Sequence, residues 1–432
     1  MAQMVNLPNT TTSFDESSNN ANKGKYLIPL ILITCLFFLW GAANNLNDIL
    51  IKQFKKAFEL SDFQSGLVQS AFYFGYFVLA MPAAIFMRKR GYKAGILLGL
   101  SLYAVGALLF YPAAESRSYG FFLFALFVIA SGLAFLETAA NPYVAALGSP
   151  KTAAFRLNLA QSFNPIGSIV GILIGQRFIF SGVEYSKEQL SKISPTELQN
   201  YYASEASAVQ IPYLIIGIIV ISFMVFIWFT KFPSVAEEEV STEKISLKTL
   251  FGIKHFRFAV ITQFFYVGAQ VGIWSYLIRY AQNAVTGMSE KDAATYLTYS
   301  LVIFMIGRFV GTALLKYVES NLLMGFYAIA CIILVGISIV STQYVGIWAL
   351  VATSFFMSIM FPTIFTLGLE GLGEGSKLGA SLLVMAIIGG AVLTAIMGYI
   401  SDLHGIKIAQ IVPIICFGVV ALYAFRGSKV SS

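Results

Sequence analysis

Long apolar runs that return along the whole chain constrain its fold more than any other feature. The run FFLFALFVIASGLAFLETAANPYVAAL, residues 121–147, holds one charged residue and is long enough for a helix to cross a bilayer. Across 432 residues, 57% are hydrophobic and only 11% are charged, whereas a soluble protein carries about 25% charged residues. The runs are continuous and do not alternate as in a barrel, so we expect an all-α integral membrane protein.

The runs predict twelve membrane-spanning helices in two sets of six. Their ranges are 26–51, 64–87, 92–113, 119–147, 155–180, 208–231, 254–283, 291–315, 320–341, 343–370, 376–400 and 409–426. We expect four parts: a disordered tail 1–25, a six-helix bundle 26–231, a charged linker 232–253, and a second bundle 254–432 that ends in a short tail. A polar insert, residues 181–207, leaves room for a short surface helix.

An even number of spans places both termini on the same side of the membrane. Lys and Arg are more frequent in the segments on that side than in those on the other. The richest short loop there holds Arg88, Lys89, Arg90 and Lys93. This positive-inside bias predicts cytoplasmic termini and explains the net charge of +7 without a nucleic-acid partner. Cys and His residues are scattered without metal-ligand spacing, and no nucleotide-binding or hydrolase motif occurs, so we expect no cofactor, no metal and no enzymatic activity.

A trace of repetition links the two sets of helices. NPYV followed by LG, residues 141–148, matches FPTI followed by LG, residues 361–368, and each copy lies in the fourth predicted helix of its half. This pattern favours a duplicated six-helix unit whose two copies meet at a central cavity and rock about it.

Glu137 is the only charged residue between Arg117 and Lys151. A carboxylate at membrane depth costs about 2.5 kcal/mol or more on insertion scales, so it usually faces a cavity or a partner. Because burial favours the protonated form, Glu137 is a candidate proton carrier. The alternative is a hydrogen bond that only holds helices together.

Polar side chains form stripes at helical spacing on four predicted helices. Asp48 is a second candidate proton carrier, or else a helix-end acid close to Lys52. The candidate substrate-binding residues are Asn45, Asn141, Asn158, Gln161, Asn164, Gln263, Tyr266, Gln270 and Trp274. A single amide is typically a cross-helix hydrogen bond. Several stripes of amides, which both donate and accept, together with aromatic faces suit a neutral sugar or polyol.

Several strings resemble the fucose–proton symporter family of the major facilitator superfamily: WGAANNLNDILIKQF, QSAFYFGYF, LETAANPYVAALG, FRLNLAQSFN, WSYLIRYA and FPTIFTLG. The resemblance runs from about Phe37 to the last helix. It implies a twelve-helix, two-half fold that imports a sugar with a proton. It also implies that Asp48 and Glu137 form the protonation pair, and that Asn45, Gln161 and Asn164 lie at the sugar.

The resemblance leaves the sugar open. Some fucose carriers have a Gln-Tyr pair just before the PTIF string, where this chain has Met360 and Phe361. We expect proton-coupled import of L-fucose or a related hexose across a bacterial inner membrane by a functional monomer. The alternatives are glucose, galactose, mannose or an N-acetylhexosamine as the substrate, sodium as the coupling ion, and a proton-driven exporter.

Overall fold

The computed structural model describes residues 28–42, 50, 53–54, 57–58, 62–178, 193–233, 247–341 and 343–429. Every regular element in these ranges is helical. The predicted tail 1–25, most of the predicted linker, and the two candidate residues Asn45 and Asp48 lie outside the described residues.

The first half supplies the predicted spans one to six. The first span is the helix Ile28–Ala42. The others are α2 (Asp62–Glu115), α3 (Tyr119–Ala146), η1 (Pro150–Thr152) with α4 (Ala153–Gln161), α5 (Phe163–Phe178), and α7 (Pro195–Ser207) with α8 (Gln210–Phe229). Gly91 lies inside α2 with φ 80° and ψ 171°, so α2 consists of two spans joined by a sharp turn that a glycine adopts without strain. The polar insert carries α7, which begins with a capping box between Ser194 and Glu197.

The second half repeats this plan. Its elements are α9 (Leu247–Gly252), α10 (Lys254–Ala284), α11 (Glu290–Leu314), α12 (Ser320–Val340), α13 (Gln343–Met357) with α14 (Met360–Leu369), η2 (Gly373–Gly375), α15 (Ser376–Met385) with η3 (Ala386–Ile388) and α16 (Gly389–His404), and α17 (Ile406–Ala409) with α18 (Ile411–Leu422) and η4 (Tyr423–Gly427). In the described part of the chain, nine helical stretches are long and apolar enough to cross a membrane, and one of them, within α2, consists of two spans joined at Gly91. Together with the helix Ile28–Ala42 and the pair α4 and α5, they account for the twelve predicted spans.

Four of the described spans break just before a proline, and the fifth and tenth spans are two of them. The span of α4 and α5 breaks at Ser162, and Pro165 is the third residue of α5. The span of α13 and α14 breaks at Ser358 and Ile359, and Pro362 is the third residue of α14. A proline ring clashes with the carbonyl group four residues earlier, which places each break where it is observed. Backbone carbonyl groups freed in this way must find other donors inside the membrane.

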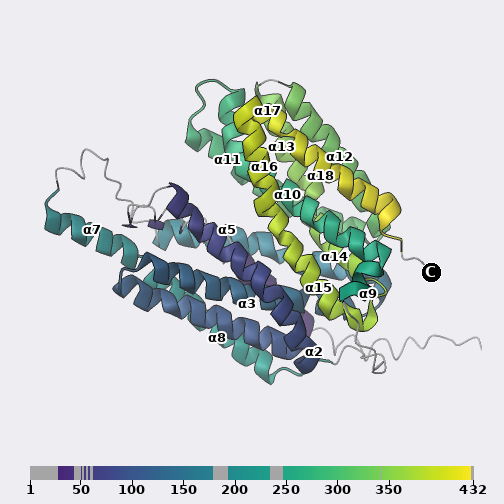
Figure 1. Cartoon of the computed structure of the whole chain (residues 1–432), viewed down its shortest axis with the longest axis horizontal. Helices are drawn as coiled ribbons and strands as arrows, with labels where there is room; N and C mark the ends of the chain where they lie inside the picture. The colour runs from purple at the N-terminus through teal and green to yellow at the C-terminus, as the bar shows by residue number, and fades with distance from the viewer. Residues whose placement is uncertain are drawn as a thin grey trace, which may run out of the picture.

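The two bundles meet at one end and diverge toward the other (Figure 1). At the meeting end, Asn158 Nδ2 donates to Thr363 Oγ1 of the other half at 3.3 Å. The ammonium groups of Lys316 and Lys377 lie over the rings of Phe155 and Tyr92, 4.9 and 5.2 Å from their centroids. We call this the closed end, where α3 ends and α10 begins, and we call the opposite one the open end.

Glycines allow the first span to pack backbone to backbone on α5. A Cβ atom added to Gly167 would lie 1.9 Å from the Phe38 carbonyl oxygen, and one added to Gly41 would lie 2.0 Å from that of Asn164. Small residues at a helix crossing permit this close approach. The crossing holds Asn164 against the first span, where its Nδ2 donates to the Phe37 carbonyl oxygen at 3.2 Å.

The variant Gly167→Ala is expected to lose about 1–3 kcal/mol of stability, because its methyl group would force the first span away from α5. The measurement is reversible unfolding in mixed micelles. Gly418→Ala is the matched control, since a Cβ at this helical glycine meets no atom within 4 Å. Equal losses in the two variants would show that the close crossing does not stabilise the fold.

Candidate functional site

A cavity of about 510 Å³ lies between the two halves. Its walls come from the first span, α2, α3, α4 and α5 on one side and from α10, α11, α14 and η3 on the other. Small-molecule sites usually measure about 300–1,000 Å³, so this cavity has room for a sugar. Five of the predicted residues line it: Glu137, Gln161, Asn164, Gln270 and Trp274.

Glu137 projects from the middle of α3 into this cavity. Only 2% of the residue is exposed, and Oε2 has no hydrogen-bond partner among the described residues. Asn141 lies one turn further along α3. An acid that is nearly buried yet borders a cavity can exchange a proton with it while remaining out of lipid.

Two amides extend the polar wall of the first half. Gln161 Nε2 donates to Asn141 Oδ1 at 2.9 Å, and Asn141 lies one turn from Glu137 on α3. Asn164 lies one turn away, anchored to the first span. The sequence separates α3 and α4 by only a short loop, and the fold therefore brings the acid and both amides to one wall.

The wall of the second half is more apolar. Gln270 and Trp274 lie on the cavity face of α10. The indole Nε1 of Trp274 donates to Ser354 Oγ at 3.2 Å, and its ring meets Phe304 edge-on with centroids 5.0 Å apart. These contacts hold the indole ring in a fixed orientation at the cavity.

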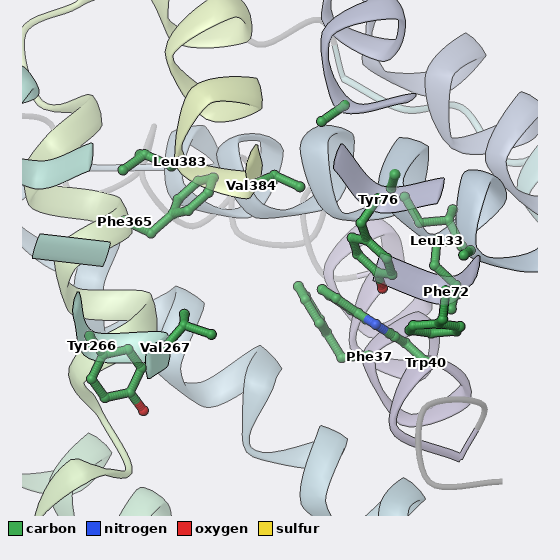
Figure 2. Packing of buried hydrophobic residues seen from close by; sticks show 14 of the residues in the cluster. Phe37, Trp40, Phe72, Tyr76, Leu133, Tyr266, Val267, Phe365, Leu383 and Val384 are labelled. Atoms are coloured by element: carbon green, nitrogen blue, oxygen red, sulfur yellow. The ribbon is translucent and has the colours of Figure 1, made fainter. Parts of the chain in front are cut away.

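An aromatic cluster on the first half faces the same space, and sequence reasoning missed it. Phe37 stacks on Trp40 with centroids 5.7 Å apart, and Phe72 lies beside Tyr76. Figure 2 shows these rings grouped together, with the Tyr76 hydroxyl pointing toward the Trp40 indole. The first predicted helix carries Gly41, Asn44, Asn45 and Asp48 at helical spacing in the sequence, and Trp40 precedes Asn44 by four residues, a signal that could have identified it. The cavity therefore has an indole on each side.

Arg308 also lines the cavity, and it is not among the candidate residues predicted from the sequence. Its guanidinium lies 4.6 Å from the Phe304 ring centroid, and it donates through Nε to the Ser358 carbonyl oxygen at 2.7 Å and through Nη1 to the Gln161 carbonyl oxygen at 3.1 Å. Both acceptors lie at helix breaks that precede a proline, one in each half. Arg308 thus supplies donors to both breaks and joins the halves at the cavity floor.

Four of the predicted residues do not line the cavity. Asn141, Asn158, Gln263 and Tyr266 are fully buried. Tyr266 donates its hydroxyl hydrogen to the Met357 carbonyl oxygen at 2.9 Å, a contact within the second half. The other three are amides that lie on the closed-end side of the cavity.

Comparison with known proteins identifies the architecture. The model of the Major Facilitator Superfamily matches residues 31–387. The chain is 48% identical to the L-fucose-proton symporter of Escherichia coli strain K12, over 99% of this chain and 100% of that protein. It is 38% identical to a glucose/galactose transporter of Brucella abortus, over 98% of this chain and 99% of that protein.

The chain belongs to the fucose–proton symporter family of the major facilitator superfamily. A crystal structure of the transporter FucP in the outward conformation matches it with a TM-score of 0.88 and 48% identity, covering 94% of this chain and all of that one. The twelve-helix fold predicted from the sequence is therefore confirmed, and the chain is a multi-pass membrane transporter, not an enzyme.

Replacing Arg308 by methionine is expected to destabilise the protein by about 1–3 kcal/mol. The Ser358 and Gln161 carbonyl oxygens would lose a buried charged donor, and a group left unsatisfied bears the cost of its desolvation. The measurement is again unfolding in mixed micelles. Lys316→Met is the control: it removes an exposed cation at the closed end and should change stability by less than about 0.5 kcal/mol. Similar losses in both variants would contradict the role of Arg308.

Proposed function

We propose that this protein imports a neutral monosaccharide, L-fucose or a related hexose, together with a proton by alternating access. The observation that carries the proposal is the composition of the central cavity. A nearly buried acid with an unpartnered oxygen shares that cavity with amides and with an indole from each half. Amides match sugar hydroxyls in donating and accepting, and aromatic faces match the apolar face of a pyranose ring.

The charges at the cavity favour a neutral substrate. Among the described lining residues, Glu137 and Arg308 carry the formal charges. The Arg308 guanidinium already donates to two carbonyl oxygens. A substrate anion would have to compete with both carbonyl groups for it. A neutral polyol needs no fixed cation.

The named relatives support a sugar and leave a choice among sugars. One is an L-fucose-proton symporter and another a glucose/galactose transporter. Phe361, one of the two residues that replace a Gln-Tyr pair of some fucose carriers, lines the cavity with an apolar ring. Glucose, galactose, mannose or an N-acetylhexosamine is the alternative substrate, and sodium is the alternative coupling ion.

The closed end is proposed to face the cytoplasm and the open end the outside of a bacterial inner membrane. Lys and Arg of the loop after Met87 lie on the closed end, which agrees with the positive-inside rule. Both termini and the linker 232–253 would then be cytoplasmic. One chain supplies both walls of the cavity, which supports a functional monomer.

We propose that Glu137 takes a proton from the open side before the cavity closes around sugar. A neutral carboxyl group is far cheaper to enclose than a carboxylate, so protonation permits closure. The halves then rock, the closed end opens, and sugar and proton leave. Asp48 is the proposed second member of the protonation pair. Each charge moved gains about 2.3 kcal/mol per 100 mV, enough for a sugar gradient of tens of fold.

The direct test is uptake by proteoliposomes of a panel of labelled hexoses with an imposed pH gradient. We expect accumulation of one or a few hexoses, led by L-fucose, and alkalinisation of the outer medium when that sugar is added. Counterflow of lipophilic dyes instead of sugars would indicate an exporter. Uptake driven by a sodium gradient without alkalinisation would indicate sodium coupling.

The variant Glu137→Gln fixes the side chain in a form that resembles the protonated acid. It is expected to exchange labelled sugar across the membrane at a rate near that of the wild type. Uphill accumulation should fall at least tenfold, because no proton is released in each cycle. Asp48→Asn is expected to keep sugar binding and lose sugar-induced alkalinisation.

Glu319→Gln is the matched control for Glu137→Gln. Glu319 caps α12 at the closed end and lies outside the cavity lining. Accumulation by this variant should equal that of the wild type. If Glu137→Gln accumulates sugar as Glu319→Gln does, Glu137 is not the proton carrier.

A further inference from the structure

Three amides lie sealed beneath the floor of the cavity on its closed-end side. Asn141 and Asn158 come from the first half and Gln263 from the second, and each is 0% exposed. Their hydrogen bonding, however, is incomplete. Within the described part of the chain, Asn141 Nδ2, Asn158 Oδ1 and both amide atoms of Gln263 have no hydrogen-bond partner.

Buried polar atoms without partners are rare in folded proteins and require an explanation. Leaving one unpaired is more costly than replacing it by an apolar group of the same shape. A packing role alone would be filled better by leucine or methionine. These amides therefore suggest a partner that is present in another state of the transporter.

The helix faces that carry these amides continue into the cavity. On α10, Gln263 lies on the same face as Val267, Gln270 and Trp274, at positions i+4, i+7 and i+11, and all three line the cavity. Asn141 lies one turn below Glu137 on α3, and Asn158 lies one turn below Gln161 on α4. Each half thus has a polar track that passes from the cavity through its floor.

Contacts between the halves close this track. Asn158 Nδ2 donates to Thr363 Oγ1 across the interface, and Arg308 Nη1 donates to the Gln161 carbonyl oxygen. If the closed end opens, both contacts must separate. Their separation uncovers the Asn158 amide, whose Nδ2 also donates to the Ala154 carbonyl oxygen at 2.9 Å, on the side from which substrate leaves.

We propose that Asn141, Asn158 and Gln263 form a second sugar subsite, which is used only when the closed end is open. The hydroxyl groups of the departing monosaccharide give the three amides the partners that they lack in this structure. The subsite rests on the proposed sugar transport and extends it: the upper amides receive the sugar, and the lower amides bind it before release. Binding from the two sides therefore depends on different residues.

The test compares Gln263→Met with Gln410→Met in right-side-out and inside-out membrane vesicles. Methionine has nearly the shape of glutamine, and Gln263 loses no hydrogen bond that the structure describes. Gln410 is equally buried with both amide atoms unpartnered among the described residues, and it lies outside the cavity lining. The probes are labelled L-fucose and its monodeoxy analogues.

Gln263→Met is expected to raise the half-saturation constant for L-fucose at the closed end about five- to tenfold, the loss of one hydrogen bond. The constant at the open end should stay within about twofold, and Gln410→Met should change neither. At the closed end, the wild type should prefer L-fucose over at least one monodeoxy analogue, and Gln263→Met should lose this preference. A variant that only shifts the conformational equilibrium would instead change the half-saturation constants of all sugars by the same factor.

A pair of variants tests the first half. Asn158→Leu removes the amide, its cross-interface bond and its bond to the Ala154 carbonyl oxygen, whereas Thr363→Val removes only the cross-interface bond and leaves the amide. Only Asn158→Leu should weaken closed-end affinity. A uniform change in the half-saturation constants of all sugars, or equal constants for Gln263→Met and Gln410→Met at the closed end, would overturn the subsite. Either result would leave the proposed sugar transport intact. Wild-type vesicles that take up no hexose would overturn the proposed function, and the subsite with it.

Discussion

The structure depends on one constraint: a polar group at bilayer depth must have a protein partner or reach water. Glu137 meets it by bordering the cavity while only 2% of it is exposed. The carbonyl groups of Gln161 and Ser358, at the two helix breaks, meet it through Arg308. Both solutions require the halves to be close at one end and apart at the other. The polar groups therefore favour the arrangement that is open at one end as strongly as the apolar packing does.

A chain of contacts follows from these solutions and crosses the interface. Asn141 lies one turn from Glu137 on α3, its Oδ1 accepts from the Gln161 side chain, and the Gln161 backbone accepts from Arg308 of the other half. Separation of the halves would break the last of these contacts. The amide of Gln161 bonds within its own half and its carbonyl group bonds across the interface. Gln161 therefore belongs both to the polar wall that holds Glu137 and to the floor that closes the cavity.

Much of this could be predicted from the sequence, because hydropathy and helical periodicity are local signals. The twelve spans, Glu137, and the cavity positions of Gln161 and Gln270 follow from run length and spacing alone. Periodicity assigns a residue to a face but does not say how far along that face the cavity extends. For this reason helical spacing groups Gln263 with Gln270, although Gln263 lies beneath the cavity floor. The role of Arg308 could not be predicted, because its two acceptors are backbone carbonyl groups at breaks in other helices and no side-chain pattern indicates such breaks.

The two halves contribute unequal chemistry to the cavity, which bears on which sugar fits. The first half supplies the acid and most of the amides, whereas Trp274, Phe304 and Phe361 make the opposite wall largely apolar. A sugar held between them should place hydroxyl groups toward the first half and its least polar face or substituent toward the second. L-fucose, a 6-deoxy sugar, has a methyl group where glucose and galactose have a hydroxymethyl group. An apolar ring at Phe361 accepts a methyl group without loss, but it would leave a buried hydroxyl group unpaired, at a cost of about 1–3 kcal/mol. The composition of this wall thus supports L-fucose as the first candidate within the proposed function and keeps the hydroxylated hexoses as its alternatives.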